Sequence, residues 1–452
     1  MQRTTLLVTI AAALILGACG DGSALPVATG KANIRGLNAI KTAPEVAFKI
    51  EERVLGTVTY RQITETQSYD DINYTFNFDV FYAGDDATTR IASQNLDIVA
   101  DMDYILVLTG TLSDPAIIVW ETAEREFADT ETVFEARFAH TADSLGSVDF
   151  YFAAAGIAPA AGTAVGTLAF GDELTSVDFE AGEYVFTITT SGMPGDILYE
   201  SIPITYAAAT QFIISPFDGD ANVFAPVIGR AFASAVGSSG GSITLSDVNY
   251  PPTVEFVNGS LAMGSVDIYA DELLTSMLVA NHMYRGVAAE LPLAAGDNPV
   301  YYTPTGLTSP VLIESTIGFF GGLRGRVVAY GPVDALETKP YVPDRRSVET
   351  HAKLGIFNAA QNFEFISVYV MDAGTTIEDT IPIRPAFPAG SVAPVVPLAP
   401  GSYDIYVTEF LQTEILAGPI RIDVALGDVL SGIIFDTVDP AVLALDFLPI
   451  NP

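Results

Sequence analysis

Few side chains in this sequence could transfer a proton or bind a metal in a defined pattern, and His140 is the first candidate. It stands nine residues before Asp149, and an imidazole beside a carboxylate can act as a general base or a metal ligand. The same spacing recurs with Asn in place of His, in Asn38/Ala47, Asn258/Asp267 and Asn358/Ser367. Because three of the four copies lack the imidazole, we interpret these residues as strand-end groups that bond nearby backbone in a turn. A metal or catalytic role for His140 is the alternative.

No other catalytic arrangement is specific. The sequence has no Gly-x-Ser-x-Gly elbow, no His-Glu-x-x-His, no phosphate loop and no Cys beyond Cys19. His282 and His351, the other two imidazoles, fall in different copies from His140. We therefore expect no enzyme, no catalytic residues, no metal site and no cofactor. A hydrolase of extracellular polymers is the third hypothesis, and calcium at the paired acids Asp70/Asp71, Asp85/Asp86 and Asp218/Asp220 is a further alternative.

The N-terminus resembles an export signal with a lipid attachment site. Arg3 precedes an apolar run from Leu6 to Leu16, which is too short to span a bilayer as a helix. Leu16-Gly17-Ala18-Cys19 resembles the bacterial lipobox, and Cys19 is the only Cys of the chain. We predict a lipoprotein signal peptide at 1–18, lipidation of Cys19 and a small, polar tether at 19–30.

The charge balance limits the partners. The chain has 55 Asp and Glu against 20 Lys and Arg, a net charge of −35. So acidic a surface repels nucleic acid and anionic lipid headgroups, so we expect no nucleic-acid partner and membrane contact only through the lipid on Cys19. We expect a protein of the bacterial cell envelope, in the outer membrane and facing the periplasm or the surface, with an envelope protein or a polysaccharide as partner.

The segments around the His/Asn positions have the pattern of β-strands. Val148, Phe150 and Phe152 alternate with Asp149 and Tyr151, and a strand turns successive side chains to opposite faces. Later in the second, third and fourth copies a glycine precedes another strand, and Gly can take positive φ in such turns. The repeated positions that we single out as structural are Asn38, His140, Asp149, Tyr151, Gly182, Tyr184, Asn258, Asp267, Tyr269, Gly296, Asn358, Tyr369, Gly401 and Tyr403.

The second copy resembles a known family. Arg137-Phe138-Ala139-His140, then Asp143 and Val148-Asp149-Phe150-Tyr151, are similar to the opening signature of domain of unknown function 4397 of bacterial secreted and surface proteins. The Ala181-Gly182-x-Tyr184 turn fits as well, while the third and fourth copies match in part and the first only weakly. The resemblance implies a β-fold and a surface setting, and no activity.

The fold class that we predict is all-β: about four tandem antiparallel β-sandwich domains of immunoglobulin-like type. The strand-end residues of successive copies, at positions 38, 140, 258 and 358, lie 102, 118 and 100 residues apart, a period that suits whole domains. Asp271 to Tyr284 has apolar spacing near 3.6, and we expect at most a short helix there. The domains that we predict are repeat 1 at 31–131, repeat 2 at 132–231, a Gly/Ser-rich linker at 232–251, repeat 3 at 252–336, a Pro-containing linker at 337–348 and repeat 4 at 349–452.

Two function hypotheses follow besides the hydrolase. The first is a non-enzymatic, lipid-anchored envelope protein that displays its modules for adhesion, scaffolding or interaction, because modules repeat and no catalytic group does. The second is a carbohydrate- or small-ligand-binding module that uses Tyr60, Tyr69, Tyr74 and Tyr82 as stacking faces. We expect Trp120, the only Trp, to lie in a core.

Overall fold

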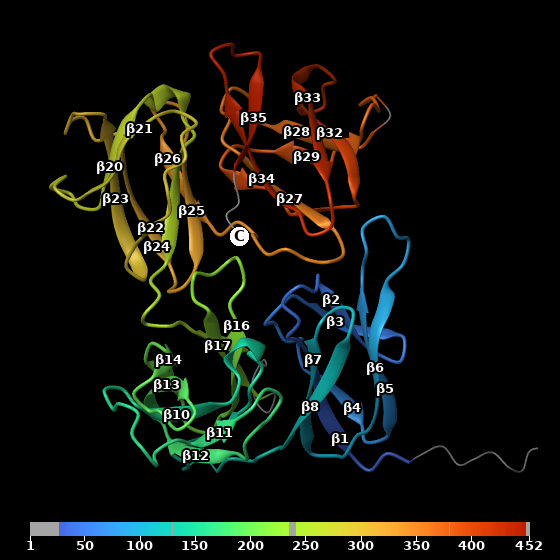
Figure 1. The fold of residues 1–452 in the computed structure, drawn as a ribbon. Helices are drawn as coiled ribbons and strands as arrows, with labels where there is room; N and C mark the ends of the chain where they lie inside the picture. The colour runs from blue at the N-terminus through green and yellow to red at the C-terminus, as the bar shows by residue number, and fades with distance from the viewer. Residues whose placement is uncertain (1–26, 129, 235–240, 379, 449–452) are drawn as a thin grey trace, which may run out of the picture.

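The computed structural model describes residues 27–128, 130–234, 241–378 and 380–448, and these residues form 35 β-strands, two short 3-10 helices and no α-helix. The predicted signal peptide and Cys19 lie outside the described residues. The strands build eight sheets, which pair into four β-sandwiches arranged as the corners of a square (Figure 1). The predicted fold class, tandem β-sandwiches, is confirmed.

Sandwich 1 shows the topology that the other three repeat. Its first sheet has the order β4-β1-β7-β8 and its second the order β3-β2-β5-β6. All pairings are antiparallel except β1 with β7, which run parallel. The strands are β1 (Lys31–Asn38), β2 (Val46–Ile50), β3 (Arg53–Val58), β4 (Gln67–Asp70), β5 (Asn73–Val80), β6 (Thr89–Asp97), β7 (Met102–Gly110) and β8 (Pro115–Ala123).

Sandwich 2 adds a fifth strand to each sheet. Its sheets have the orders β12-β9-β16-β17-β18 and β11-β10-β13-β14, with β15 also paired to β13. The elements are β9 (Val133–Phe138), η1 (Asp143–Leu145), β10 (Val148–Ala154), β11 (Gly166–Leu168), β12 (Val177–Glu180), β13 (Gly182–Thr190), β14 (Ile197–Glu200), β15 (Ile204–Tyr206), β16 (Gln211–Asp218), β17 (Val227–Ala233) and β18 (Ser242–Leu245).

Sandwich 3 has the sheet orders β22-β19-β25-β26 and β21-β20-β23-β24. Its elements are β19 (Thr253–Asn258), η2 (Leu261–Met263), β20 (Val266–Tyr269), β21 (Met277–His282), β22 (Leu291–Pro292), β23 (Gly296–Pro304), β24 (Ile313–Phe319), β25 (Arg324–Tyr330) and β26 (Glu337–Tyr341).

Sandwich 4 has the orders β30-β27-β34-β35, with β31 also paired to β27, and β29-β28-β32-β33. Its strands are β27 (Ala352–Asn358), β28 (Ile366–Asp372), β29 (Arg384–Phe387), β30 (Ser391–Val392), β31 (Val396–Leu398), β32 (Gly401–Glu409), β33 (Ile415–Val424), β34 (Val429–Asp436) and β35 (Leu443–Leu448).

One parallel pair occurs in each sandwich, which refines the expectation of purely antiparallel sheets. The pairs are β1/β7, β9/β16, β19/β25 and β27/β34. A parallel pair needs a crossover connection, and here the strands of the second sheet supply it. The first strand of each repeat is thereby held beside a strand that comes late in the same repeat.

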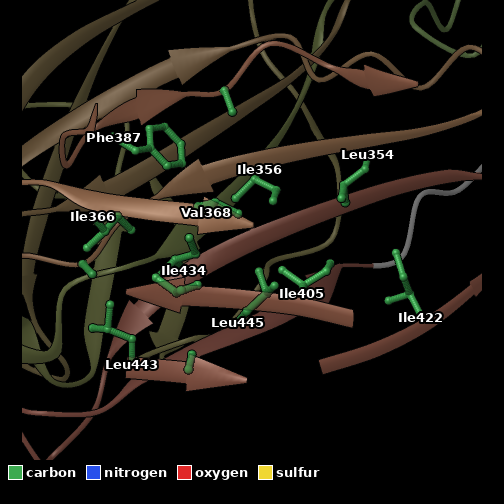
Figure 2. Close-up of a cluster of buried hydrophobic side chains, with 14 of the residues drawn as sticks. Leu354, Ile356, Ile366, Val368, Phe387, Ile405, Ile422, Ile434, Leu443 and Leu445 are labelled. Atoms are coloured by element: carbon green, nitrogen blue, oxygen red, sulfur yellow. The ribbon is translucent and has the colours of Figure 1, made fainter. Parts of the chain in front are cut away.

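Each sandwich closes around its own apolar core. Figure 2 shows that of sandwich 4, where Ile356, Val368, Ile405 and Ile434 come from both sheets and point toward one another. The corresponding residues Phe150, Ile268 and Val368 occupy the same strand of their sandwiches and are at most 1% exposed. Burying one such side chain stabilises the fold by about 1.5–3 kcal/mol. The alternation that predicted these strands therefore follows from burial on one face.

Two expectations about local structure were wrong. Met277–His282, inside the stretch where we expected a short helix, forms β21, which pairs with β20 through two register irregularities. Ser242–Leu245 and Glu337–Tyr341, which we placed in linkers, are the edge strands β18 and β26. In all three cases pairing to a neighbouring strand satisfies backbone groups and overrides the local pattern.

Candidate functional site

The His and Asn residues at the strand ends hold turns together. The Nδ1 atom of His140 accepts the Ala142 N–H (3.3 Å), and its Nε2 lies 2.8 Å from the Gly146 carbonyl oxygen. Asn258 repeats both contacts, because its Oδ1 accepts the Ser260 N–H and its Nδ2 donates to the Gly264 carbonyl. The imidazole of His140 and the amide of Asn258 thus make equivalent contacts in the turn. Burial lowers the pKa of His140.

Asn38 and Asn358 occupy the corresponding places. Their Oδ1 atoms accept the N–H groups of Ile40 (2.9 Å) and Ala360 (3.0 Å). All four of these strand-end residues are fully buried. The contacts of these four residues fix the chain as it leaves the first strand of each sandwich. In His140 they involve both ring nitrogens.

The repeated Asp residues each clamp a glycine turn on the neighbouring hairpin. Asp149 accepts the Gly192 N–H (2.7 Å), and Asp267 accepts the Gly306 N–H (2.8 Å). Both glycines have φ of +75°, a conformation that Gly adopts without steric cost. The aspartates are buried, so their carboxylates order the loops that follow β13 and β23.

The remaining repeated positions are also parts of the framework. The hydroxyls of Tyr184 and Tyr403 donate to the carbonyls four residues upstream, Glu180 and Ala399, at 2.9 Å. Each hydroxyl bonds across the glycine of its turn, Gly182 or Gly401. The corresponding glycine of sandwich 3, Gly296, has a φ of +93°. The tyrosines of the second strand are buried: Tyr151, Tyr269 and Tyr369.

The tyrosines proposed as stacking faces lie in different surroundings. Tyr60 is 6% exposed and belongs to an apolar cluster between sandwiches 1 and 2. Tyr69, Tyr74 and Tyr82 are half-buried and pack against the core of sandwich 1. These four rings therefore do not form a common ligand platform. Trp120 is buried, but in the cluster with Tyr60 rather than in the core of one sandwich.

A Tyr-Arg pair joins sandwich 1 to sandwich 2, and a second one joins sandwich 3 to sandwich 4. The Tyr60 hydroxyl donates to the Asp218 carbonyl (2.9 Å), and the Tyr284 hydroxyl donates to the Asp436 carbonyl (2.6 Å). Each ring meets the Phe preceding that Asp edge-on, at 86° for Phe217 and 83° for Phe435.

The arginine that follows each tyrosine completes the contact. Arg61 pairs with Asp220 (3.0 Å), and Arg285 Nε donates to Asp446 (2.7 Å). Their backbone N–H groups donate to the carbonyls of Asn38 and Asn258, both at 2.8 Å. We call each set the Tyr-Arg clip. It starts from the strand-end Asn and reaches the next sandwich.

Sandwiches 2 and 4 have no such clip at the corresponding position. There the N–H that reaches the strand-end residue belongs to glycine: Gly171 donates to the His140 carbonyl and Gly390 to the Asn358 carbonyl. Odd and even sandwiches thus differ in the same way in both halves. This alternation indicates a unit of two sandwiches that occurs twice, and the chain passes from the first unit to the second between β18 and β19.

Buried ion pairs support the same two interfaces. Arg35 pairs with Asp103 at 2.9 Å, and Ser234 of sandwich 2 donates to that carboxylate. Arg326 pairs with Glu255 at 2.7 Å and also donates to the Ser431 hydroxyl of sandwich 4. Both arginines are 0% exposed. Charges so buried require partners, and here the next sandwich helps to supply them.

The connecting segment 342–351 is bonded to all four sandwiches. Arg345 donates to Glu255 (2.8 Å) and its backbone N–H to Asn222 of sandwich 2. Arg346 donates to the Lys41 carbonyl of sandwich 1 (2.9 Å), and Asp344 accepts from Lys353 of sandwich 4 (2.6 Å). This segment, which shares residues 342–348 with the predicted linker 337–348, is therefore the centre of the molecule, and in Figure 1 it passes between the upper and lower sandwiches.

Beside this segment lies a cleft of about 370 Å³ between sandwiches 1 and 4, which we call the 1–4 cleft. Sandwich 1 contributes hydroxyls, carboxylates and one aromatic ring, and the other wall belongs to the connecting segment, β27 and the chain around β31. Burial lowers the pKa of Lys353 and of His351 in this wall. Among its lining residues are Glu45, Thr57, Asp79, Phe81, Asp344, Arg346, His351 and Lys353.

Sequence reasoning did not find the clips, the central segment or the 1–4 cleft. The two Tyr-Arg dipeptides were a usable signal, but they lie 22 and 26 residues after Asn38 and Asn258. Within the described residues, no group of three or more His, Cys, Asp or Glu could hold a metal ion. No helix in that part of the chain is long and apolar enough to cross a membrane.

A family model described as "Domain of unknown function (DUF4397)" matches residues 32–151. The chain therefore resembles this family over sandwich 1 and the first strands of sandwich 2, up to the Val148–Tyr151 signature. The match includes repeat 1, whose residues resemble the signature least. No curated protein matches the chain.

Three of the solved structures that match this chain do so with low identity and low TM-scores. The Bacillus anthracis TIE protein is 10% identical, with 90% of this chain and 69% of that chain covered and a TM-score of 0.15. A family 26 carbohydrate-binding module from Eubacterium rectale Amy13K, solved with maltoheptaose, is 13% identical over 42% of this chain and 94% of that chain, with a TM-score of 0.14. The multi-modular glycogen-degrading pneumococcal virulence factor SpuA is 9% identical over 85% and 37%, with a TM-score of 0.15. These similarities are too low to support a function.

Proposed function

We propose that this protein is a non-enzymatic, lipid-anchored protein of the bacterial cell envelope that presents four β-sandwiches to a protein or polysaccharide partner as one rigid body. The observation that carries the proposal is the bonding of the segment 342–351 to all four sandwiches. A scaffold of this kind fixes the distances between its exposed loops.

Rigidity changes how repeated modules would bind. We expected independent modules whose weak contacts add through effective concentration. Modules held in one fixed arrangement instead lose little further conformational entropy when a partner contacts two of them at once. The Tyr-Arg clips and the buried pairs Arg35–Asp103 and Arg326–Glu255 favour this second mode. No catalytic role is assigned to His140, since both its ring nitrogens contact backbone groups.

The anchor is tested by membrane fractionation of cells that express the full chain. The wild-type protein is expected in the membrane fraction, and Cys19→Ala is expected in the soluble fraction with its fold intact by circular dichroism. Ser23→Ala, a neighbouring change outside the lipobox, serves as the control and stays with the membrane. A Cys19→Ala protein that remains in the membrane fraction refutes lipid anchoring.

The display role is tested separately, by cross-linking the anchored protein in intact cells and identifying what co-purifies. A defined envelope protein or polysaccharide is expected with the wild type. Glu255→Ala, which leaves Arg326 and Arg345 without their shared carboxylate, is expected to loosen the scaffold and reduce the yield of that partner. An unchanged yield from a loosened scaffold contradicts the rigid-display proposal.

A further inference from the structure

The 1–4 cleft has the size and position of a small-molecule site. Its volume of about 370 Å³ lies in the range usual for ligand pockets, which occur preferentially at domain interfaces. One wall is the outer face of β2, β3 and β5. The other combines the connecting segment with β27 and Val395. A ligand here would contact two sandwiches that are more than 250 residues apart in sequence.

The polar groups of the cleft suit a ligand with many hydroxyls. Thr57 and Thr88 offer exposed hydroxyls, and Glu45 and Asp344 offer carboxylates. A carboxylate has two acceptor oxygens and can bond two neighbouring hydroxyls of a sugar, while threonine can both donate and accept. Lys353 and Arg346 line the same wall as Asp344.

Two carboxylates of the cleft, Asp344 and Asp79, are held in place before any ligand arrives. Asp344 accepts from Lys353 (2.6 Å) and from the Asn222 amide (3.3 Å). On the facing wall, Asp79 is 4% exposed and pairs with both Lys49 and Arg90. Preorganised polar groups lower the ordering cost of binding.

An aromatic ring completes the site. Phe81 follows β5 directly, lines the cleft and is 39% exposed. A half-exposed ring presents an apolar face on which the C–H face of a sugar ring can pack. Val395 and Pro397 provide further apolar surface on the other wall.

We propose that the 1–4 cleft binds a neutral saccharide of one or two rings, with Phe81 as the packing face and Glu45, Asp344 and the threonines as hydroxyl partners. A neutral sugar is favoured over an anion because the whole molecule carries a net charge of −35, which repels small anions. The site does not depend on the lipid anchor, so the two proposals can fail independently.

The test is saturation-transfer NMR followed by calorimetry on the detergent-solubilised full chain. The neutral probes are glucose, galactose, N-acetylglucosamine and maltose, and the anionic probes are glucuronate and glutamate. Saturable binding of at least one neutral probe is expected, with Phe81→Ala weakening it by about five- to tenfold and Glu45→Gln weakening it in the same direction.

Phe170→Ala is the matched control, because Phe170 is 38% exposed on sandwich 2 and lies outside the cleft. It is expected to bind as the wild type does. Three results would overturn the proposal: no saturable binding of any neutral probe, binding of the anionic probes alone, or equal affinities for Phe81→Ala and Phe170→Ala. Circular dichroism of each variant shows that the fold is retained.

Discussion

At the scale of single residues, the repeated aspartates do their work through oxygens that both accept hydrogen bonds. The Asp267 Oδ1 accepts the Asn281 N–H (2.7 Å), and its Oδ2 accepts the Gly306 N–H (2.8 Å). In Asp267→Asn the new amide group faces a donor, so one backbone N–H stays unsatisfied. We expect a loss of about 1–3 kcal/mol in the free energy of unfolding, measured by urea titration. Asp334→Asn, on an exposed loop, is the control and should change it by less than about 0.5 kcal/mol.

The strand-end imidazole makes a prediction about pH. Burial lowers the pKa of His140 in the folded protein, so the unfolded chain binds its proton more readily. The contribution of neutral His140 to the free energy of unfolding is therefore fully present above the pKa of the unfolded chain, about 6.5. It decreases as the pH falls below that pKa. His140→Asn keeps the turn contacts that Asn258 makes but cannot titrate. We expect urea midpoints at pH 7.5 and 5.5 to differ less in this variant than in the wild type.

His282 and His351 also have lowered pKa values through burial, so the pH slope should shrink in His140→Asn rather than vanish. An identical slope in wild type and variant would show that His140 carries no such linkage. His140→Ala separates the two roles, since it removes the turn contacts as well and should destabilise the fold at both pH values.

At the scale of strands and sheets, alternation was informative where one face is buried and misleading elsewhere. Val148, Phe150 and Phe152 point into one core, so their period of two predicted β10. Met277–His282 has no such period, because β21 is largely exposed and its pairing with β20 is irregular. The contacts between sandwiches could not be predicted. Ile105 and Val107 have the apolar side chains of core residues, but they lie in the cluster between sandwiches 1 and 2. Strands buried on both faces lose alternation altogether.

The sheet-to-sheet contact between sandwiches 1 and 2 gives a prediction at this scale. Trp120 is 1% exposed and packs in that contact with Phe217 and Phe232. Trp120→Ala should cost about 3–5 kcal/mol while leaving the four cores intact. In calorimetry we expect the unfolding of sandwiches 1 and 2 to separate into an additional transition. Val54→Ala, a 53% exposed position of the same sandwich, should keep the wild-type profile. A single unshifted transition in Trp120→Ala would show that this interface is not cooperative.

At the scale of the whole molecule, Glu255 is where the halves and the connecting segment meet. Its Oε2 accepts from Arg326 (2.7 Å) and from Arg345 (2.8 Å), and the carboxylate is buried. In Glu255→Ala both guanidinium groups lose this partner, which should cost about 3–5 kcal/mol. Because Arg345 also ties the segment to Asn222, we expect the arrangement of sandwiches to loosen, seen as a larger radius of gyration in small-angle X-ray scattering.

A pair of comparison variants separates loss of the charge partner from loss of a side chain. The double variant Glu255→Ala/Arg345→Met removes one of the two guanidinium groups that lose their carboxylate partner. Part of the lost free energy of unfolding should therefore return, and a double-mutant cycle measures the coupling energy between the two residues. Glu52→Ala removes an exposed partner of Arg90, 81% accessible, and should cost less than about 1 kcal/mol with no change in scattering. If Glu255→Ala changes the free energy of unfolding and the radius of gyration no more than Glu52→Ala does, the four sandwiches are held together by their apolar contacts alone. The segment 342–351 then contributes nothing to their arrangement.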